Sequence, residues 1–175
     1  MKYAKDKVGL WMIGASGRVG SAVALGVTAL AKRLVPPTGL VSALPVFDAV
    51  PLIDPGTIVI GGHEVRSETI LDAIHAAHEK AKLFDEKVIR RCAPRLRAMQ
   101  RNLRPGSLYG AGPTIRKLAD LKGLEKEQSG SAAIERLSAD IDAFRRRFSL
   151  DRVVVIHVAS SEPPFRRHAA HARFD

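Results

Sequence analysis

Apolar and polar positions alternate along the chain in blocks that predict strands and helices in turn. Residues 8–13, VGLWMI, form a short and nearly all-apolar run, typical of a parallel strand covered on both faces. Gly14, Gly17 and Gly20 follow at once. The block after them predicts an amphipathic helix, because apolar residues recur there every three or four positions, at Val19, Val23, Val27, Leu30 and Leu34. The chain therefore opens with a strand, a glycine turn and a helix.

Later apolar blocks predict further strands. Residues 57–62, TIVIGG, and residues 152–158, RVVVIHV, have the length and composition of buried strands. The second run is almost entirely apolar, which predicts a central position in the sheet. Residues 40–44 predict another strand, and residues 107–110 are a candidate for a short one.

Two longer segments show helical patterns. Residues 67–102 have Ser67 as the expected N-cap and Pro94 as an expected interruption. After a linker at 122–130, a second segment carries an apolar stripe, formed by Ile134, Leu137, Ile141, Phe144 and Phe148. Because strands alternate with helices, the chain predicts an α/β fold with a largely parallel sheet.

Length and composition fit one globular domain. The chain has 175 residues, of which 46% are hydrophobic and 26% charged. The single cysteine, Cys92, excludes an internal disulfide and fits a reducing cytosol. No stretch has the pattern of a signal peptide or a membrane span, so a cytoplasmic protein without membrane contact is expected.

The formal net charge of +10 is unevenly distributed. Seven basic residues and no acidic one lie between Lys87 and Arg104, and Arg145, Arg146 and Arg147 form a second block. No aromatic residues interleave with the longer run, and no nucleic-acid-binding motif is present. The runs are therefore interpreted as solvated or interaction faces, and no nucleic-acid partner is expected.

The glycine turn carries the clearest candidate chemistry. A turn of this kind lets the backbone approach a pyrophosphate, and the helix that follows offers free N–H groups and a partial positive charge. Ser16 and Arg18 are candidate phosphate partners. The spacing G-x-x-G-x-x-G predicts a dinucleotide site and leaves NAD and NADP open.

Residues that follow the other strands are expected at the same edge of the sheet. A dinucleotide site usually has a carboxylate for the ribose hydroxyls, and Glu64 is preferred to Asp48 because it ends a better-defined strand. Residues 159–161, Ala-Ser-Ser, follow the last strand. The histidine pairs 75/78 and 168/171 lack the further ligands that zinc requires, so no metal site is expected.

Taken together, several segments resemble one family, the myo-inositol-1-phosphate (inositol-3-phosphate) synthases, most closely the bacterial type. They occur in the family's order and are VGLWMIGASGRVGSAVALGVTAL, PPTGLVSALPVFDAV, TIVIGGHEVRSETILDAIHAA, LRPGSLYGAG and LDRVVVIHVASSEPPF. The resemblance implies a Rossmann-like, doubly wound, mostly parallel α/β domain over residues 1–175, with a sheet that is incomplete at its C-terminus.

This resemblance implies an NAD-dependent isomerase of inositol and phospholipid biosynthesis, which converts glucose 6-phosphate to inositol phosphate. NAD oxidises the sugar at C5, the ketone permits enolisation and aldol closure, and the NADH formed reduces the ring ketone. The implied cofactor residues are Gly14, Ala15, Ser16, Gly17, Arg18, Val19, Gly20, Glu64, Ser107, Leu108, Ala159, Ser160 and Ser161. Ala15, Ser16 and Arg18 replace the glycine and asparagine usual in the family, so weak NAD binding is expected.

The family's catalytic lysines and its ligands for the substrate phosphate lie in a second domain, beyond residue 175. The chain is accordingly expected to be a fragment, a truncated gene product or a domain with another role, and to be inactive alone. The expected partners are glucose 6-phosphate, only when that domain is supplied, and a second copy of the chain in a homo-oligomer.

Two alternatives stay open at this point. One is a short-chain reductase or epimerase, but the Tyr-x-x-x-Lys pair of those enzymes is found only at Tyr3 and Lys7, ahead of the first strand. The other is a non-enzymatic NAD(P)-binding module.

Overall fold

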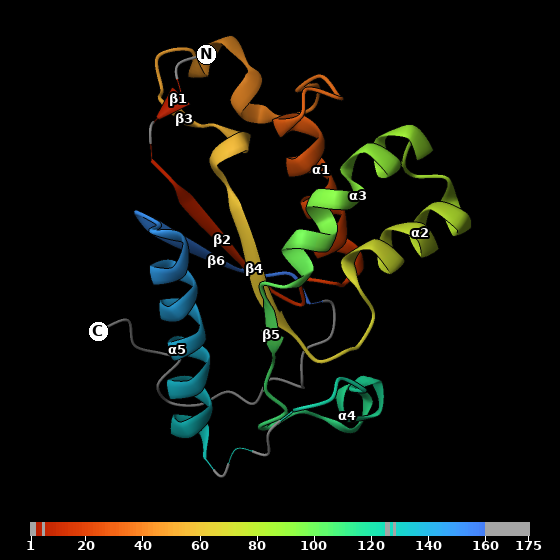
Figure 1. Ribbon diagram of the computed structural model, residues 1–175, viewed down its shortest axis with the longest axis vertical. Coiled ribbons are helices and arrows are strands. Elements are labelled where there is room, and N and C mark those ends of the chain that lie inside the picture. The colour runs from red at the N-terminus through yellow and green to blue at the C-terminus, as the bar shows by residue number, and fades with distance from the viewer. Residues whose placement is uncertain (1–2, 5, 125–126, 128, 160–175) are drawn as a thin grey trace.

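The computed structural model describes residues 3–4, 6–124, 127 and 129–159 and is built around a parallel sheet of four strands (Figure 1). These strands are β2 (Val8–Ile13), β4 (Val59–Glu64), β5 (Leu103–Pro105) and β6 (Arg152–His157). Their order is β5-β4-β2-β6. Numbered along the chain, this is the order 3-2-1-4 of a Rossmann-like nucleotide-binding half, as predicted.

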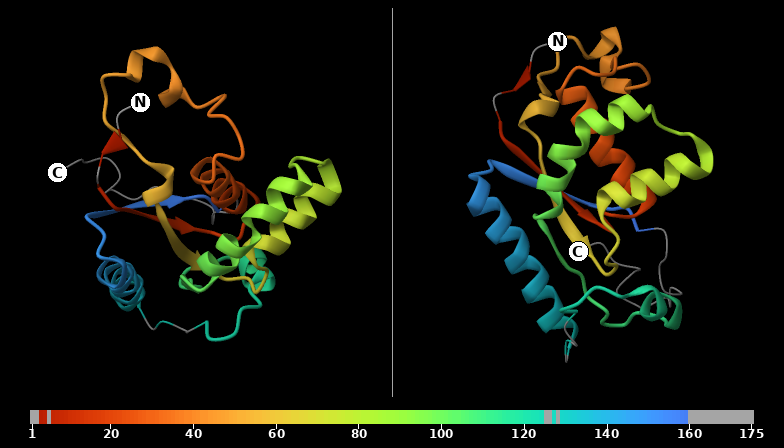
Figure 2. Two further views of the ribbon diagram at one scale, coloured as in Figure 1. Left: turned by 45° about the horizontal axis from the view of Figure 1, so that its top comes forward. Right: turned by 45° about the vertical axis from the view of Figure 1, so that its right-hand side comes forward.

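Helices cover both faces of the sheet. Figures 1 and 2 show α1 (Arg18–Ala31), α2 (Ile70–Ala81) and α3 (Glu86–Gln100) on one face and α5 (Gly130–Phe148) on the other. The short α4 (Pro113–Leu118) lies near the carboxyl ends of the strands. A small separate ladder joins β1 (Tyr3–Ala4) to β3 (Leu52–Ile53), and single 3₁₀ turns occupy Val41–Ala43, Pro45–Phe47 and Pro55–Thr57. No helix of the described residues is long and apolar enough to cross a bilayer.

α1 packs on the sheet through small side chains. The stripe that the sequence predicts is displaced, because Val19 at its start is 53% exposed. The residues that are buried are Gly20, Ser21, Ala24, Leu25, Thr28 and Ala29. Small residues on this face let the helix axis come close to the sheet, and Val23 and Val27 pack at its sides.

The other face is organised around Phe144 of α5. A Cβ added at Gly9 or at Gly61 would lie 2.9 Å from the Phe144 ring, so these two glycines make the space in β2 and β4 that the ring fills. The ring also meets Trp11 edge to face, with centroids 5.0 Å apart. The two strand glycines and the aromatic stripe of α5 are therefore one packing unit.

Residues 40–44 do not form the predicted strand. They contribute instead to two exposed 3₁₀ turns. Pro36, Pro37 and Pro45 remove backbone donors around this segment, which a ladder would need. As a result, β4 is the second strand of the sheet and pairs directly with β2, and it begins and ends two residues later than predicted.

The predicted central position of the last strand is not seen among the described residues, where β6 lies at the edge of the sheet. β6 pairs with β2, and no described strand pairs with its other edge. Val154 and Val155 are 46% and 49% exposed, because few described residues cover this end of the sheet. An apolar run indicates a strand with neighbours but does not say on how many sides they lie.

The predicted long helical region divides into two helices. α2 is capped by Thr69 rather than Ser67, in a reciprocal capping box with Asp72. α3 starts after Asp85 and runs through Pro94, which lies on its solvent-exposed side and does not end it. The short strand expected at residues 107–110 lies earlier, at β5. Pro113 is the first residue of α4, where proline is favourable.

Replacing Phe144 tests the packing unit on the α5 face. Phe144→Ala is expected to lower the free energy of unfolding by about 3–5 kcal/mol, since it leaves a cavity over two glycines. Ile134→Ala in the same helix is the matched control and should cost less than about 0.5 kcal/mol, because Ile134 is 66% exposed. Urea unfolding measures both, with Phe144→Leu as the milder variant if the alanine variant does not fold. Equal losses for Phe144→Ala and Ile134→Ala would contradict the assignment.

Candidate functional site

A cavity of about 500 Å³ lies where the carboxyl ends of β2, β4 and β6 meet. Of the residues expected at a cofactor site, those that line it are Gly14, Gly17, Arg18, Val19, Glu64 and Ala159. Residues not expected there are Val65, Arg66, Ile115, Leu118 and Val158. The structure thus brings three separate predicted segments to one place.

The glycine turn is fixed on the end of β4. The N–H groups of Gly14 and Ala15 both donate to the carbonyl of His63, at 2.9 and 3.4 Å. Gly14 has φ +85°, and a Cβ there would lie 3.0 Å from Ala159. A Cβ at Gly62 would clash with the carbonyl oxygen of Met12 and the side chain of Ala15. The loop can therefore take this course only because both positions lack a side chain.

Gly17 and Gly20 have different structural roles. A Cβ at Gly20 would clash with the carbonyl of Ala15, so this glycine lets α1 pack against the turn. Gly17 has an ordinary extended conformation, with φ −65° and ψ 169°. A Cβ at Gly17 would lie 3.0 Å from the Gly14 carbonyl oxygen and 3.9 Å from the guanidinium of Arg66. The backbone at Gly17 is thus open toward the cavity and the Arg66 guanidinium.

The N-terminus of α1 faces the same cavity. Its first residues, Arg18 and Val19, line the cavity, and the first N–H groups of a helix have no acceptor within the helix itself. No side chain caps this end, and the first turn contains no acidic residue. The partial positive charge of the helix end is therefore available to an anion, as expected from the sequence.

Glu64 closes the turn from the side of β4. Its carboxylate accepts hydrogen bonds from the N–H of Ser16 at 3.0 Å and from the Ser16 hydroxyl at 2.7 Å. It also accepts from the N–H groups of Val65 and Arg66, at 2.9 and 3.3 Å. Only 6% of Glu64 is exposed. The carboxylate thus holds the loop in shape while it borders the cavity.

Arg66 is the main residue that sequence reasoning missed. Its guanidinium donates to the carbonyl of Ser16 at 3.1 Å and to Glu68 at 2.7 Å, and it lies 3.7 Å from Glu64. Arg66 therefore joins the loop to β4 and places positive charge at the cavity. Its position two residues after the acid that ends β4 was the available signal.

α4 forms one wall of the cavity. Ile115 and Leu118 of this helix line it. The segment is tied to the end of β4 by the N–H of Leu121, which donates to the carbonyl of Val65 at 3.1 Å. Asp120 accepts from the backbone and the hydroxyl of Ser67, at 2.6 and 2.7 Å, and these hydrogen bonds lower its pKa. The wall is apolar and its attachment is polar.

Other predicted residues lie behind the cavity or away from it. Ala15, Ser16 and Gly20 are buried within the turn, so the Ser16 hydroxyl faces Glu64 and not the cavity. Ser107 donates to Glu127 at 3.1 Å, and the Leu108 carbonyl accepts from Arg116 at 3.3 Å; neither residue lines the cavity. Ser160 and Ser161 lie outside the described residues. Among those that are described, no group of three or more side chains could hold a metal.

A buried polar network supports the site from the α5 face. The Trp11 indole donates to Nδ1 of His63 at 3.0 Å, which requires Nδ1 to be unprotonated, because an indole N–H can only donate. Nε2 therefore carries the proton and donates to Asp140 at 3.1 Å. Burial lowers the pKa of His63 despite the opposing effect of Asp140. Since the His63 carbonyl holds the glycine turn, this neutral imidazole links α5 to the site.

From Asp140 the network continues to the linker before α5. Arg136 lies 3.5 Å from Asp140 and 2.6 Å from Glu127, which is largely buried. The pKa of Glu127 is lowered, because the hydrogen bonds from Arg136, its own backbone and Ser107 together outweigh burial. α5 is held to the sheet by its aromatic stripe and by hydrogen bonds, from Arg136 to the carbonyls of Pro105 and Gly106 and from His63 to Asp140.

Comparison with known proteins gives one consistent result. A family model for an NAD-binding domain, described as myo-inositol-1-phosphate synthase, matches residues 8–175. Inositol-3-phosphate synthase 1 of Populus euphratica is 26% identical over 120 residues, which are 67% of this chain and 22% of the plant protein. The crystal structure of inositol-3-phosphate synthase from Caenorhabditis elegans has the same fold, with a TM-score of 0.66 and 20% identity over 88% of this chain. The chain covers only 34% of the nematode protein.

The pH dependence of stability tests the neutral state of His63. In the unfolded chain His63 takes up a proton near its ordinary pKa of 6.5, whereas in the folded chain its pKa is lower. The unfolded state therefore binds more protons as the pH falls through about 6.5, and the folded state loses stability until its own pKa is passed. His63→Gln is expected to lose less stability between about pH 7 and pH 5 than the unchanged chain.

Thermal unfolding across this pH range measures the effect. His75→Gln is the matched control, because His75 is exposed on α2 and should leave the pH dependence unchanged. If His63→Gln has the same pH dependence as the unchanged chain, the neutral state assigned to His63 is wrong.

Proposed function

Since the chain belongs to the myo-inositol-1-phosphate synthase family, we propose that it forms the NAD-binding part of an inositol-3-phosphate synthase. NAD is the cofactor of this domain. The whole enzyme would convert glucose 6-phosphate to inositol phosphate. Because the chain spans between about a fifth and a third of the relatives' own lengths, the substrate and the reaction are part of the proposal.

The observation that carries the proposal is the open backbone at Gly17. Its φ and ψ suit any residue, so glycine is needed there for space, since a Cβ would also lie only 3.0 Å from the Gly14 carbonyl oxygen. What its missing side chain provides is space beside an uncapped helix N-terminus, in a cavity of about 500 Å³. A pyrophosphate needs this combination of close backbone approach and free N–H donors. The residues present therefore fit the cofactor.

The chain's own residues would bind and orient NAD. The backbone of residues 14–20 would hold the pyrophosphate, with Arg18 and Arg66 adding positive charge. Glu64 would take the adenosine ribose, since it ends the second strand of the sheet, where a dinucleotide site usually has its acid. Ala159 would border the cofactor at the end of β6. Ser107 and Leu108 are left out of the proposed site because they do not line the cavity.

The bound NAD would supply reversible hydride transfer. Among the described residues that line the cavity none is a lysine, and the one carboxylate there, Glu64, is assigned to the ribose. We therefore assign no catalytic role within this chain. Substrate binding and proton transfer would belong to the rest of the enzyme, and this chain alone would bind NAD without turnover.

Gly17→Val tests the pyrophosphate site. The valine side chain would fill the space between the loop and Arg66, so binding of NAD should fall at least tenfold in calorimetric titration. Gly26→Ala is the control, because nothing lies within 4 Å of a Cβ there. It should keep NAD binding and raise the free energy of unfolding by roughly 0.5–1 kcal/mol. NAD affinity that is the same in both variants would refute the assignment.

A second pair of variants distinguishes the role of Glu64 from that of Ser16. Both changes release the loop, but only Glu64 would contact the ribose. Ser16→Ala is expected to cost about 1–3 kcal/mol of stability, because it leaves buried hydrogen-bonding capacity of Glu64 unused. Glu64→Gln should weaken NAD binding about tenfold more than Ser16→Ala does. If the two variants weaken binding equally, Glu64 acts on the loop alone.

A further inference from the structure

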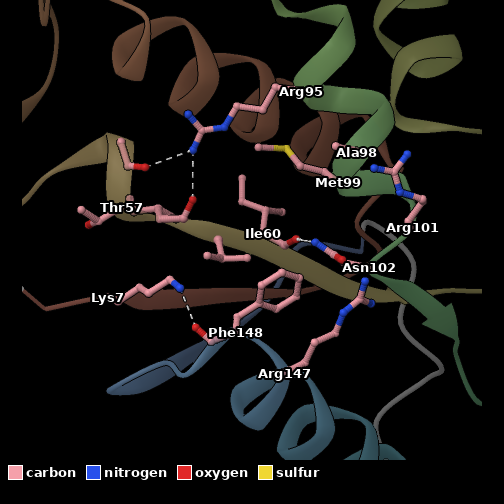
Figure 3. A pocket seen from close by; sticks show the side chains of 13 residues that line it. Lys7, Thr57, Ile60, Arg95, Ala98, Met99, Arg101, Asn102, Arg147 and Phe148 are labelled. Carbon is pink, nitrogen blue, oxygen red and sulfur yellow. Dashed lines mark hydrogen bonds between the residues drawn. The ribbon is translucent and has the colours of Figure 1, made fainter.

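A second cavity lies on the open edge of β4, away from the cofactor site. β5 pairs with β4 only from Gly62 onward, so the strand's earlier residues have no strand beside them on that edge among the described residues. A groove of about 510 Å³ occupies this place between α3 and α5 (Figure 3). It shares no lining residue with the cavity at the strand ends.

The exposed edge of β4 is already satisfied by side chains. Arg95 of α3 donates to the carbonyl of Ile58 at 3.2 Å, and Asn102 donates to the carbonyl of Ile60 at 2.9 Å (Figure 3). An added strand would have to displace both. The groove is therefore closed to strand pairing, and its occupant must be recognised by side chains.

The groove is strongly cationic. It is lined by Lys7, Arg95, Arg101 and Arg147, and no carboxylate is among the described residues that line it. Three arginines outside the groove, Arg66, Arg136 and Arg152, do form ion pairs with acids in the described chain. The two basic runs noted in the sequence thus meet across β4, and no acidic side chain balances them there.

Hydrogen bonds within the described structure do not occupy all of these cationic side chains. Within the second run, Arg145 donates to the carbonyls of Leu150 and Asp151 and so closes the end of α5. The side chains of Arg101 and Arg147 donate no such hydrogen bond to any described residue. The Arg147 guanidinium lies instead 5.1 Å from the centre of the Phe148 ring, at the groove. These two guanidinium groups are available to an incoming anion.

The floor of the groove is apolar. Its half-buried apolar residues are Ile58, Val59 and Phe148, whereas Ile60 and Met99 are buried in the core. An inorganic ion would leave this surface in contact with water, whereas an organic anion with a flat apolar body would cover it. Guanidinium groups pair well with phosphate oxygens, and a doubly charged phosphate suits more than one of them.

We propose that this groove is a second binding site, separate from the NAD site, for a phosphate monoester of a flat, apolar organic molecule. The phosphate pairs with Arg101 and Arg147, and the apolar body lies on Ile58 and Phe148. The site does not depend on the proposed enzymatic function, because none of its residues belongs to the cofactor cavity.

The test uses 1-naphthyl phosphate as the probe, with the complete 175-residue chain. In calorimetric titration at low salt we expect saturable binding of one probe per chain, weakened as the salt concentration rises. In amide NMR spectra the shifts should centre on Ile58, Ile60 and the side-chain amide of Asn102. Arg147→Gln should lower the affinity at least fivefold. Arg146→Gln removes the same charge next to the groove and should change the affinity less than twofold.

Four results would overturn the proposal. The probe binds the NAD site instead if Gly17→Val abolishes its binding. Charge is not recognised if 1-naphthol binds as tightly, and the apolar floor plays no part if inorganic phosphate does. Equal affinities of the Arg147→Gln and Arg146→Gln variants would show general attraction to a basic protein and no site.

Discussion

The close approach of the glycine turn to the end of β4 is the constraint on which the rest of the structure depends. It is set by absent side chains, since a Cβ at Gly62 would clash with the backbone of β2 and one at Gly20 would clash with the turn itself. Once the loop lies there, the His63 carbonyl and the Glu64 carboxylate become its acceptors. The same approach fixes the first turn of α1, and so aims its free N–H groups at the cavity.

This arrangement makes one strand serve three purposes. The backbone of β4 holds the turn, the His63 side chain on one face joins α5 through Asp140, and Glu64 at the end borders the cavity. The glycine turn and the attachment of α5 are therefore joined through neighbouring residues of β4. Because the imidazole must be neutral to accept from Trp11, this connection is sensitive to acid.

The balance between positive and negative side chains differs at the two ends of β4. At the carboxyl end, Arg66 lies beside Glu64 and Glu68, so the positive charge there is partly balanced. Along the open edge near the start of β4, Lys7, Arg95, Arg101 and Arg147 have no such balance. The net charge of +10 therefore does not show where in the structure positive charge is left unbalanced.

Local patterns determined the parts of the fold that depend on near neighbours. The strand at Val8–Ile13, the glycine turn, α1 and the amphipathic α5 were predicted from the sequence, because apolar spacing and glycine positions act over a few residues. The same holds for the candidate loop at Gly14 and Gly17. Gly14 and Gly17 line the cavity because the strands run parallel, which the alternation of elements also predicted.

Only the tertiary structure decided which segments lie beside one another. Leu40–Leu44 has the composition of a strand but lies between prolines and stays exposed, so β4 takes the place beside β2. Only the structure shows that Ser16 donates to Glu64, that Arg66 lines the cavity and that β6 lies at the edge of the described sheet. Each of these contacts involves residues tens of positions apart in the sequence. The sequence by itself determined the strand, turn and helix that can receive a pyrophosphate. The tertiary structure determined what surrounds them, since burial and charge balance are properties of neighbours in space.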